Sequence, residues 1–313
     1  MEIQSKIINN INFKDSKTNS SNNYIPNKVA IVTIIWNFIL AAFKFIAGII
    51  GNSSAMISDA IHSASDIFST IVVIIGIKLA SKEPDKEHPY GHERLECIAA
   101  IILSMLLFVT GLEIGISAIK SLLSGNTTSN EIGVIALIAA IASIIVKEAM
   151  YWYTRHYAKR LKSGALMADA WHHRSDSLSS IGALIGIIGA RQGLVWADSV
   201  ASIVIFLFIA KASWDIFIDA IDKLIDKACD EETERKMRKF VVRHKDVLGI
   251  DLFQTRQFGN KIYVDIEIVV NGEYSLNQAH AIAEEIHDKI EQEFDNVKHV
   301  MIHVNSASKE RLA

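Results

Sequence analysis

A short pattern of aspartate, histidine and serine residues occurs twice in this sequence, over residues 59–69 and 169–179. Each copy supplies one histidine and one aspartate four residues apart: His62 and Asp66 in the first, His172 and Asp176 in the second. A step of four residues returns to nearly the same face of a helix, so each pair lines one stripe. Two such stripes facing each other would offer two imidazoles and two carboxylates to one ion. The pattern therefore predicts a four-ligand site for a divalent metal.

The donor types indicate which metal such a site would take. Two histidines with two carboxylates suit tetrahedral zinc, whereas an all-oxygen set would suit manganese or magnesium better. Asp59 and Asp169 precede the two pairs by one helical turn. We expect them to accept hydrogen bonds from the ligand histidines, or to attract cations at the external mouth. His173 points about 100° away from His172 and is expected at a helix contact or a vestibule.

Both copies lie in stretches of membrane-spanning length, for which about 20 predominantly apolar residues are needed. Half of the 313 residues are apolar. Six spans are expected, near residues 29–51, 54–81, 96–123, 131–153, 163–190 and 195–218. The fifth begins with polar residues, as the second does, because the repeated pattern opens both. Ionisable groups at membrane depth are costly and usually line a pathway or a site.

The charges between the spans predict the orientation. Lysine and arginine gather after the second, fourth and sixth spans, whereas the opposite connections hold only Arg191. Because basic loops tend to stay inside, we expect a protein of the cell membrane with both termini in the cytoplasm. The polar, Asn/Ser-rich residues 1–27 predict a disordered cytoplasmic tail before a transport domain at 28–220.

After residue 228 the pattern becomes that of a soluble domain. Helical and strand-like patterns alternate in the order α-β-β-α-β, over residues 231–244, 250–256, 261–270, 275–294 and 299–304. The pair Gly259-Asn260 supplies a hairpin turn between the first two strands. This order suits a small α+β sandwich at 228–313. The expected fold class is therefore an α-helical membrane protein with six transmembrane helices and an α+β C-terminal domain.

Two further groups of side chains are of metal-ligand type. The first lies in the connection after the second span and comprises Asp85, His88 and His92. The second lies in the C-terminal domain and comprises Asp251, Asp265, His280 and His303, with His287 and His299 nearby. Charged loops are usually solvated and surface histidines are common. Spacing alone therefore leaves both a metal site and a plain surface open for each group.

Two smaller features suggest helix contacts. Gly111-x-x-x-Gly115 permits close helix approach and is interpreted as a possible dimer seam. Lys147-Glu148 is interpreted as a snorkelling or local pair at the end of the fourth span.

The same sequence argues against several classes of function. The formal net charge of -3 does not favour a nucleic-acid binder. Cys97 and Cys229 match no paired-cysteine pattern, so neither a disulfide framework nor a thiolate zinc site is implied. No Ser-His-Asp arrangement, phosphate-binding loop or dinucleotide fingerprint is evident, so an enzyme or an ATP-driven pump is not expected.

Together these features resemble the cation diffusion facilitator family of divalent-metal exporters. The resemblance rests on the six spans, the His-Pro-Tyr-Gly-His loop at 88–92, the two ligand pairs and the C-terminal domain. It implies a ferredoxin-like cytoplasmic domain, a homodimer, and exchange of cytoplasmic metal for protons by alternating access. By position it implies a transport site at His62, Asp66, His172 and Asp176, a loop site at Asp85, His88 and His92, and a weaker tail site at Asp251, Asp265, His280 and His303.

The chemistry of the ligands suits such an exchange, because metal needs neutral histidine and ionised aspartate and so competes with protons for the same atoms. Zinc is the ion we expect, with no prosthetic group; iron, cobalt, cadmium, nickel and manganese stay open. The expected partners are divalent ions, protons and membrane lipid. Two rivals are a membrane metalloenzyme, which would need an open coordination position, and a metal sensor with a vestigial membrane part.

Overall fold

A computed structural model describes residues 24–50, 54–124, 134–191 and 197–307 of the chain, and the statements below concern these residues. They form two compact units, and the chain divides between Ala220 and Ile221. The tail expected over 1–27 lies outside the described residues, except for its last four, which begin the first helix. The side chains of Asp59 and His62 also lie outside the described part of the chain.

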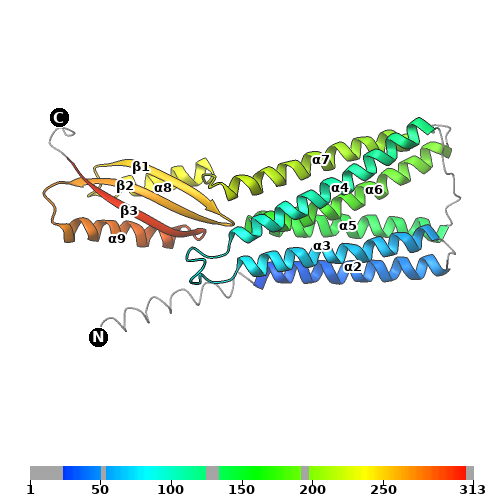
Figure 1. Cartoon of the computed structure of the whole chain (residues 1–313), viewed down its shortest axis with the longest axis horizontal. Coiled ribbons are helices and arrows are strands. Elements are labelled where there is room, and N and C mark those ends of the chain that lie inside the picture. The colour runs from blue at the N-terminus through cyan, green and yellow to red at the C-terminus, as the bar shows by residue number, and fades with distance from the viewer. Residues whose placement is uncertain (1–23, 51–53, 125–133, 192–196, 308–313) are drawn as a thin grey trace. The chain divides into compact units, whose positions relative to one another are not determined.

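In the first unit the described residues form six long helices (Figure 1), in the places where six spans are expected. They are α2 (Tyr24–Ile50), α3 (Ser54–Ala80), α4 (Arg94–Ser124), α5 (Val134–Leu161), α6 (Gly164–Arg191) and α7 (Ala197–Leu224). Among them, Lys28–Ala47 and Arg94–Lys120 are long and apolar enough, by length and composition, to cross a membrane. The number of membrane crossings stays a prediction.

The outer surface of these helices is apolar, and their interior holds ionisable side chains among apolar ones. Phe38, Phe68 and Phe208 are each more than 60% exposed, whereas Lys147 and Asp169 are buried. A protein folded in water would normally bury the first set and expose the second. Contiguous exposed apolar surface of this kind fits a hydrocarbon surrounding.

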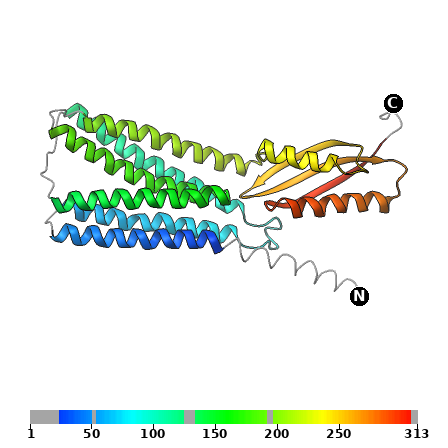
Figure 2. The ribbon, with the colours of Figure 1, turned by 180° about the vertical axis from the view of Figure 1, so that it is seen from behind.

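Helix α6 occupies a central place, because it packs against α3, α4 and α5, while α2 packs against α3 and α5 (Figures 1 and 2). Gly111 and Gly115 do not mark a free surface of α4, as a dimer seam would require. A Cβ atom added at Gly111 would lie 2.8 Å from Ile209 of α7, and one added at Gly115 would lie 2.8 Å from the ring of Phe206. The two glycines therefore make room for α7 within the same chain.

The second unit confirms the expected α-β-β-α-β order. Its elements are α8 (Glu231–Val242), β1 (Gly249–Phe258), β2 (Lys261–Asn271), α9 (Leu276–Glu293) and β3 (Val297–Ala307). The Asp230 side chain caps α8, and Ser275 with Gln278 forms a capping box on α9. Gly259 has a φ of 63° in the expected turn between β1 and β2, a conformation that glycine adopts without strain.

The sheet has the order β1-β2-β3, with β1 and β2 antiparallel and β2 and β3 parallel. Its core face carries Val264, Ile266 and Ile268 of β2, which pack with Met237 of α8 and Ile286 of α9 in one apolar cluster. Both helices therefore cover the same face of the sheet. The other face carries the alternate residues of the strands.

Candidate metal site between the helices

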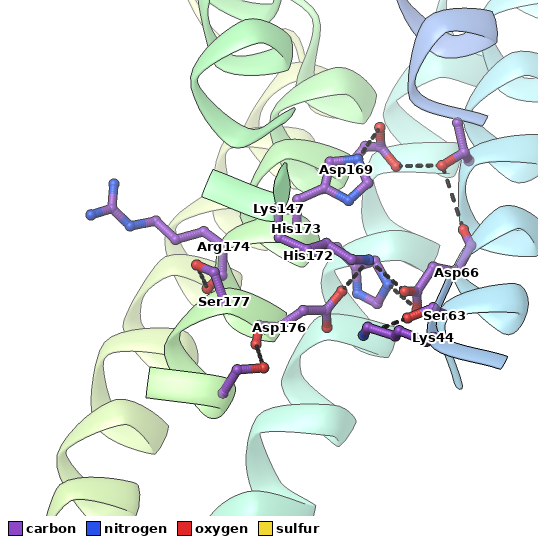
Figure 3. A network of polar contacts seen from close by, with 12 residues as sticks. Lys44, Ser63, Asp66, Lys147, Asp169, His172, His173, Arg174, Asp176 and Ser177 are labelled. Atoms are coloured by element: carbon purple, nitrogen blue, oxygen red, sulfur yellow. Dashed lines mark hydrogen bonds and ion pairs between the residues drawn. The ribbon is translucent and has the colours of Figure 1, made fainter. Parts of the chain in front are cut away.

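Three of the predicted ligands come together inside the helical unit. Asp66 lies on α3, while His172 and Asp176 lie one turn apart on the facing side of α6 (Figure 3). His172 Nε2 is 3.2 Å from Asp66 Oδ1, and one ligand atom from each residue lies within 4.8 Å of the other two. Asp66 is buried, and the side chains of His172 and Asp176 are 13% and 15% exposed. The arrangement brings one imidazole and two carboxylates to one point away from bulk water.

A lysine that the sequence analysis interpreted differently completes this cluster. Lys147 of α5 donates to Asp66 Oδ2 at 2.5 Å and to Asp176 Oδ2 at 2.8 Å, and its side chain is only 2% exposed. It does not snorkel, and it is not paired with Glu148. Glu148 instead accepts hydrogen bonds from Ser177 of α6 and from Trp152.

A sequence signal for Lys147 exists. Lys147 stands on a stripe of α5 with Ser143, Tyr151 and Thr154, all of which are buried. Polar residues repeating on one face of an apolar helix indicate that this face turns inward.

A second buried polar layer lies one turn away along α6. Asp169 Oδ1 accepts a hydrogen bond from Thr70 of α3 at 3.1 Å, and Asp169 Oδ2 is 3.5 Å from His173 Nε2. Both Asp169 and His173 are fully buried. The expectation that Asp169 orients a ligand histidine is not met by these contacts, since its partner is His173 rather than His172. The same contacts place His173 at a helix contact between α3 and α6.

The loop between α3 and α4 gathers Asp85, His88 and His92. Asp85 Oδ1 is 3.3 Å from His88 Nδ1, and Asp85 Oδ2 is 3.4 Å from His92 Nε2. The other ring nitrogen of His92 is 3.3 Å from the carbonyl oxygen of Lys82, which fixes the ring. The hydrogen bond from the Lys82 ammonium, together with that from the backbone N–H of His88, holds the pKa of Asp85 well below its usual range. The loop therefore presents an ionised carboxylate between two imidazoles.

The tail site does not form within one chain as the sequence predicted. Asp265 and His303 stand on the open face of the sheet, because their neighbours Ile266 and Val304 belong to the core cluster. His280 lies on α9, which covers the opposite face, and its ring pairs with Glu284 at 3.3 Å. The sheet itself therefore separates His280 from Asp265 and His303.

A different group of polar side chains lies together on the open face of the sheet. Asn305 donates to Asp251 Oδ2 at 2.9 Å and to Glu267 Oε2 at 3.1 Å, and Glu267 is the register partner of His303. Glu267 was missed by the sequence analysis. The register of β1 against β2 is broken between Ile250 and Leu252. This break decides which carboxylate of β2 lies near Asp251, and the alternation of apolar residues along the strand does not reveal it.

Comparison with known proteins gives matches over nearly the whole described chain. The family model of the cation efflux transmembrane domain matches residues 30–225, and that of the cation efflux protein cytoplasmic domain matches residues 229–307. An uncharacterized transporter of Methanocaldococcus jannaschii is 36% identical over 278 residues, which cover 89% of this chain and 97% of that protein. The manganese efflux system protein MneP of Bacillus subtilis is 33% identical over 293 residues, which cover 91% of this chain and 98% of that protein. A solved nickel form of the MamM CTD is 20% identical, with a TM-score of 0.25, and the match covers 25% of this chain and all of that one.

Proposed function

Since the chain belongs to the cation diffusion facilitator family, whose members are membrane transporters and not enzymes, we propose that it exports a divalent transition metal, zinc above others, in exchange for protons. The observation that carries this proposal is the convergence of Asp66, His172 and Asp176 between α3 and α6. His62 stands one turn before Asp66 on α3 and is proposed as the fourth ligand, from the repeated pattern.

Zinc is preferred over manganese because of the donor atoms. Imidazole nitrogen is a borderline ligand that suits zinc, iron and nickel, whereas manganese favours oxygen. MneP is named a manganese efflux protein, which makes manganese the rival ion in any competition. Exchange for protons follows from chemistry, because His172, Asp66 and Asp176 can bind either protons or metal, but not both at once.

Lys147 gives this site a further property. Its ammonium holds one oxygen of each carboxylate, so the site already contains one positive charge. At a separation of about 4 Å and an effective dielectric constant of about 20, a divalent ion and an ammonium repel each other by about 8 kcal/mol. We therefore propose that the Lys147 ammonium and the metal occupy the carboxylates in turn, and that the ammonium holds them together after metal release.

The remaining sequence predictions complete the proposal. Asp85, His88 and His92 are proposed as a loop metal site. The match to the dimer-type C-terminal domain supports a homodimer. We also propose that the protein lies in the cell membrane, with both termini in the cytoplasm, and moves the metal out of the cell.

Flux in sealed lipid vesicles tests the proposed function. Purified protein is reconstituted, and zinc entry and internal pH are followed together with trapped indicators. His172→Ala and Asp176→Asn are expected to stop both signals, because each removes a ligand. Two matched controls, His156→Ala on an exposed part of α5 and Asp215→Asn on an exposed part of α7, should transport normally. Near-normal zinc flux in the two site variants would refute the site, and zinc flux without a pH change would refute proton exchange.

A further inference from the structure

A separate cluster of metal-ligand side chains lies in the C-terminal domain, at the junction of α9 and the edge strand β3. His287 and Glu291 are four residues apart on α9 and share one face of the helix. His299 reaches the same point from β3. His287 Nε2 is 3.1 Å from Glu291 Oε1, and His299 Nδ1 is 3.5 Å from the same oxygen.

The hydrogen bonds of His287 decide which of its ring atoms is available. Its Nδ1 lies 2.7 Å from the carbonyl oxygen of Val300, which can only accept, so Nδ1 carries the hydrogen. In a neutral imidazole the other nitrogen, Nε2, then has a lone pair. That lone pair faces a carboxylate oxygen of Glu291, and the ring of His299 faces the same oxygen. Two acceptor atoms that face each other, as His287 Nε2 and Glu291 Oε1 do, need a proton or a metal ion between them.

The distances fit a transition metal. With zinc-to-ligand distances of about 2.0–2.1 Å, two ligands of a tetrahedral site stand about 3.3 Å apart. The observed separations of 3.1 and 3.5 Å bracket this value. A ligand histidine whose other nitrogen donates to a backbone carbonyl is the usual arrangement at metal sites, because it fixes the tautomer and the ring.

We propose that His287, Glu291 and His299 form a site for a divalent transition metal such as zinc, with water in the fourth position. The side chains are 30%, 32% and 48% exposed, which leaves a path for the ion and room for that water. The bound ion would link α9 to the edge strand of the sheet. This proposal goes beyond the transport function and does not depend on it, because none of the three residues belongs to the helical unit.

Zinc stoichiometry of the purified full-length chain tests the proposal. The protein in detergent is dialysed against buffered zinc, and bound metal per chain is measured by elemental analysis. His299→Ala is the main variant, since its side chain is half exposed and its loss costs little stability. We expect it, and Glu291→Gln, to bind one zinc ion fewer per chain than the parent. Zinc should also raise the unfolding temperature of the parent more than that of either variant.

His244 of the same domain offers a control. It pairs with Glu285 of α9 at 3.4 Å, yet in the described part of the chain that pair belongs to no three-residue cluster of this kind. His244→Ala should therefore keep the parent stoichiometry. The proposal is overturned if His299→Ala binds as much zinc as the parent, or if His244→Ala loses as much as His299→Ala. Unchanged stoichiometry in the variants would mean that a proton alone lies between His287 and Glu291.

Discussion

Replacing Lys147 by methionine should make the transporter bind zinc more tightly and release it more slowly. Methionine fills a similar volume without a charge, so it removes the ammonium that holds Asp66 and Asp176 at 2.5 and 2.8 Å. In the parent, an incoming zinc ion must first break these two contacts. In the variant it meets two carboxylates that no ammonium holds.

The magnitude follows from the two contacts. A hydrogen bond to a charged group contributes about 1.5–3 kcal/mol, so the pair amounts to about 3–6 kcal/mol. Since every 1.4 kcal/mol is a factor of ten, the zinc dissociation constant should fall by about a hundredfold to ten-thousandfold. Removing one partner of a buried ionic cluster also costs about 3–5 kcal/mol of stability. The metal-free variant should therefore unfold more easily, and zinc should restore most of the loss.

Three measurements check this reasoning. Competition with a chelator of known affinity gives the dissociation constant. Thermal unfolding in detergent, with and without zinc, gives the stability. Flux in vesicles gives turnover, which should fall at saturating zinc because release becomes slow. Lys211→Met is the matched control: Lys211 is an exposed lysine of α7 paired with Asp215, and its removal should leave zinc affinity unchanged.

A dissociation constant for Lys147→Met that equals or exceeds the parent value would refute competition between the ammonium and the metal. Weaker binding would instead make Lys147 a residue that positions the carboxylates for zinc. If zinc does not restore the thermal stability of Lys147→Met, the ammonium only stabilises the packing of the helices.

The other predictions concern the loop, the ligand set and the helix contact. Because the hydrogen bond from Lys82 keeps the pKa of Asp85 below its usual range, the contribution of this carboxylate is lost only in strong acid. The ratio of loop zinc affinities between parent and Asp85→Asn should thus be the same at pH 8 and pH 5 in calorimetry; a ratio that approaches one at pH 5 would show protonation of Asp85. His62→Asp should weaken the preference for zinc over manganese in competitive flux, and an unchanged ratio would remove His62 from selectivity. Gly115→Leu should destabilise the helical unit by about 1–3 kcal/mol in thermal unfolding, because its Cβ would lie 2.8 Å from Phe206; an unchanged midpoint would contradict that packing.

The convergence of Asp66 with His172 and Asp176 was predictable because the information is local. A four-residue spacing fixes the shared face of α6, and the repeat of the pattern indicates that the two faces meet. The role of Lys147 was not predictable in the same way. The sequence of α5 shows only that the Lys147 side chain shares a face with Ser143 and Tyr151. Which residues it contacts depends on how α5 packs against the other helices.

The C-terminal domain shows the same division. The order of its elements and the turn at Gly259 follow from alternation and turn chemistry along the chain. Its polar clusters depend on contacts across strands. Asp251 lies at a register break. Asn305 therefore links it by hydrogen bonds to Glu267, and not to Asp265. Within one chain His280 lies on the side of the sheet opposite Asp265 and His303, which the sequence does not reveal, because a helix position says nothing about which side of the sheet the helix covers.

The proposed alternation of the Lys147 ammonium with the metal has a consequence for potassium and sodium, because the tethered ammonium would keep them from the carboxylates. Because it is attached to the chain, it competes with free monovalent ions at a high effective concentration, and such ions bring no more charge than it does. A divalent ion brings twice the charge and can displace it. Potassium should therefore weaken zinc binding to Lys147→Met in chelator competition while leaving the parent unchanged. Equal sensitivity of both proteins to potassium would show that the discrimination comes from the ligands alone.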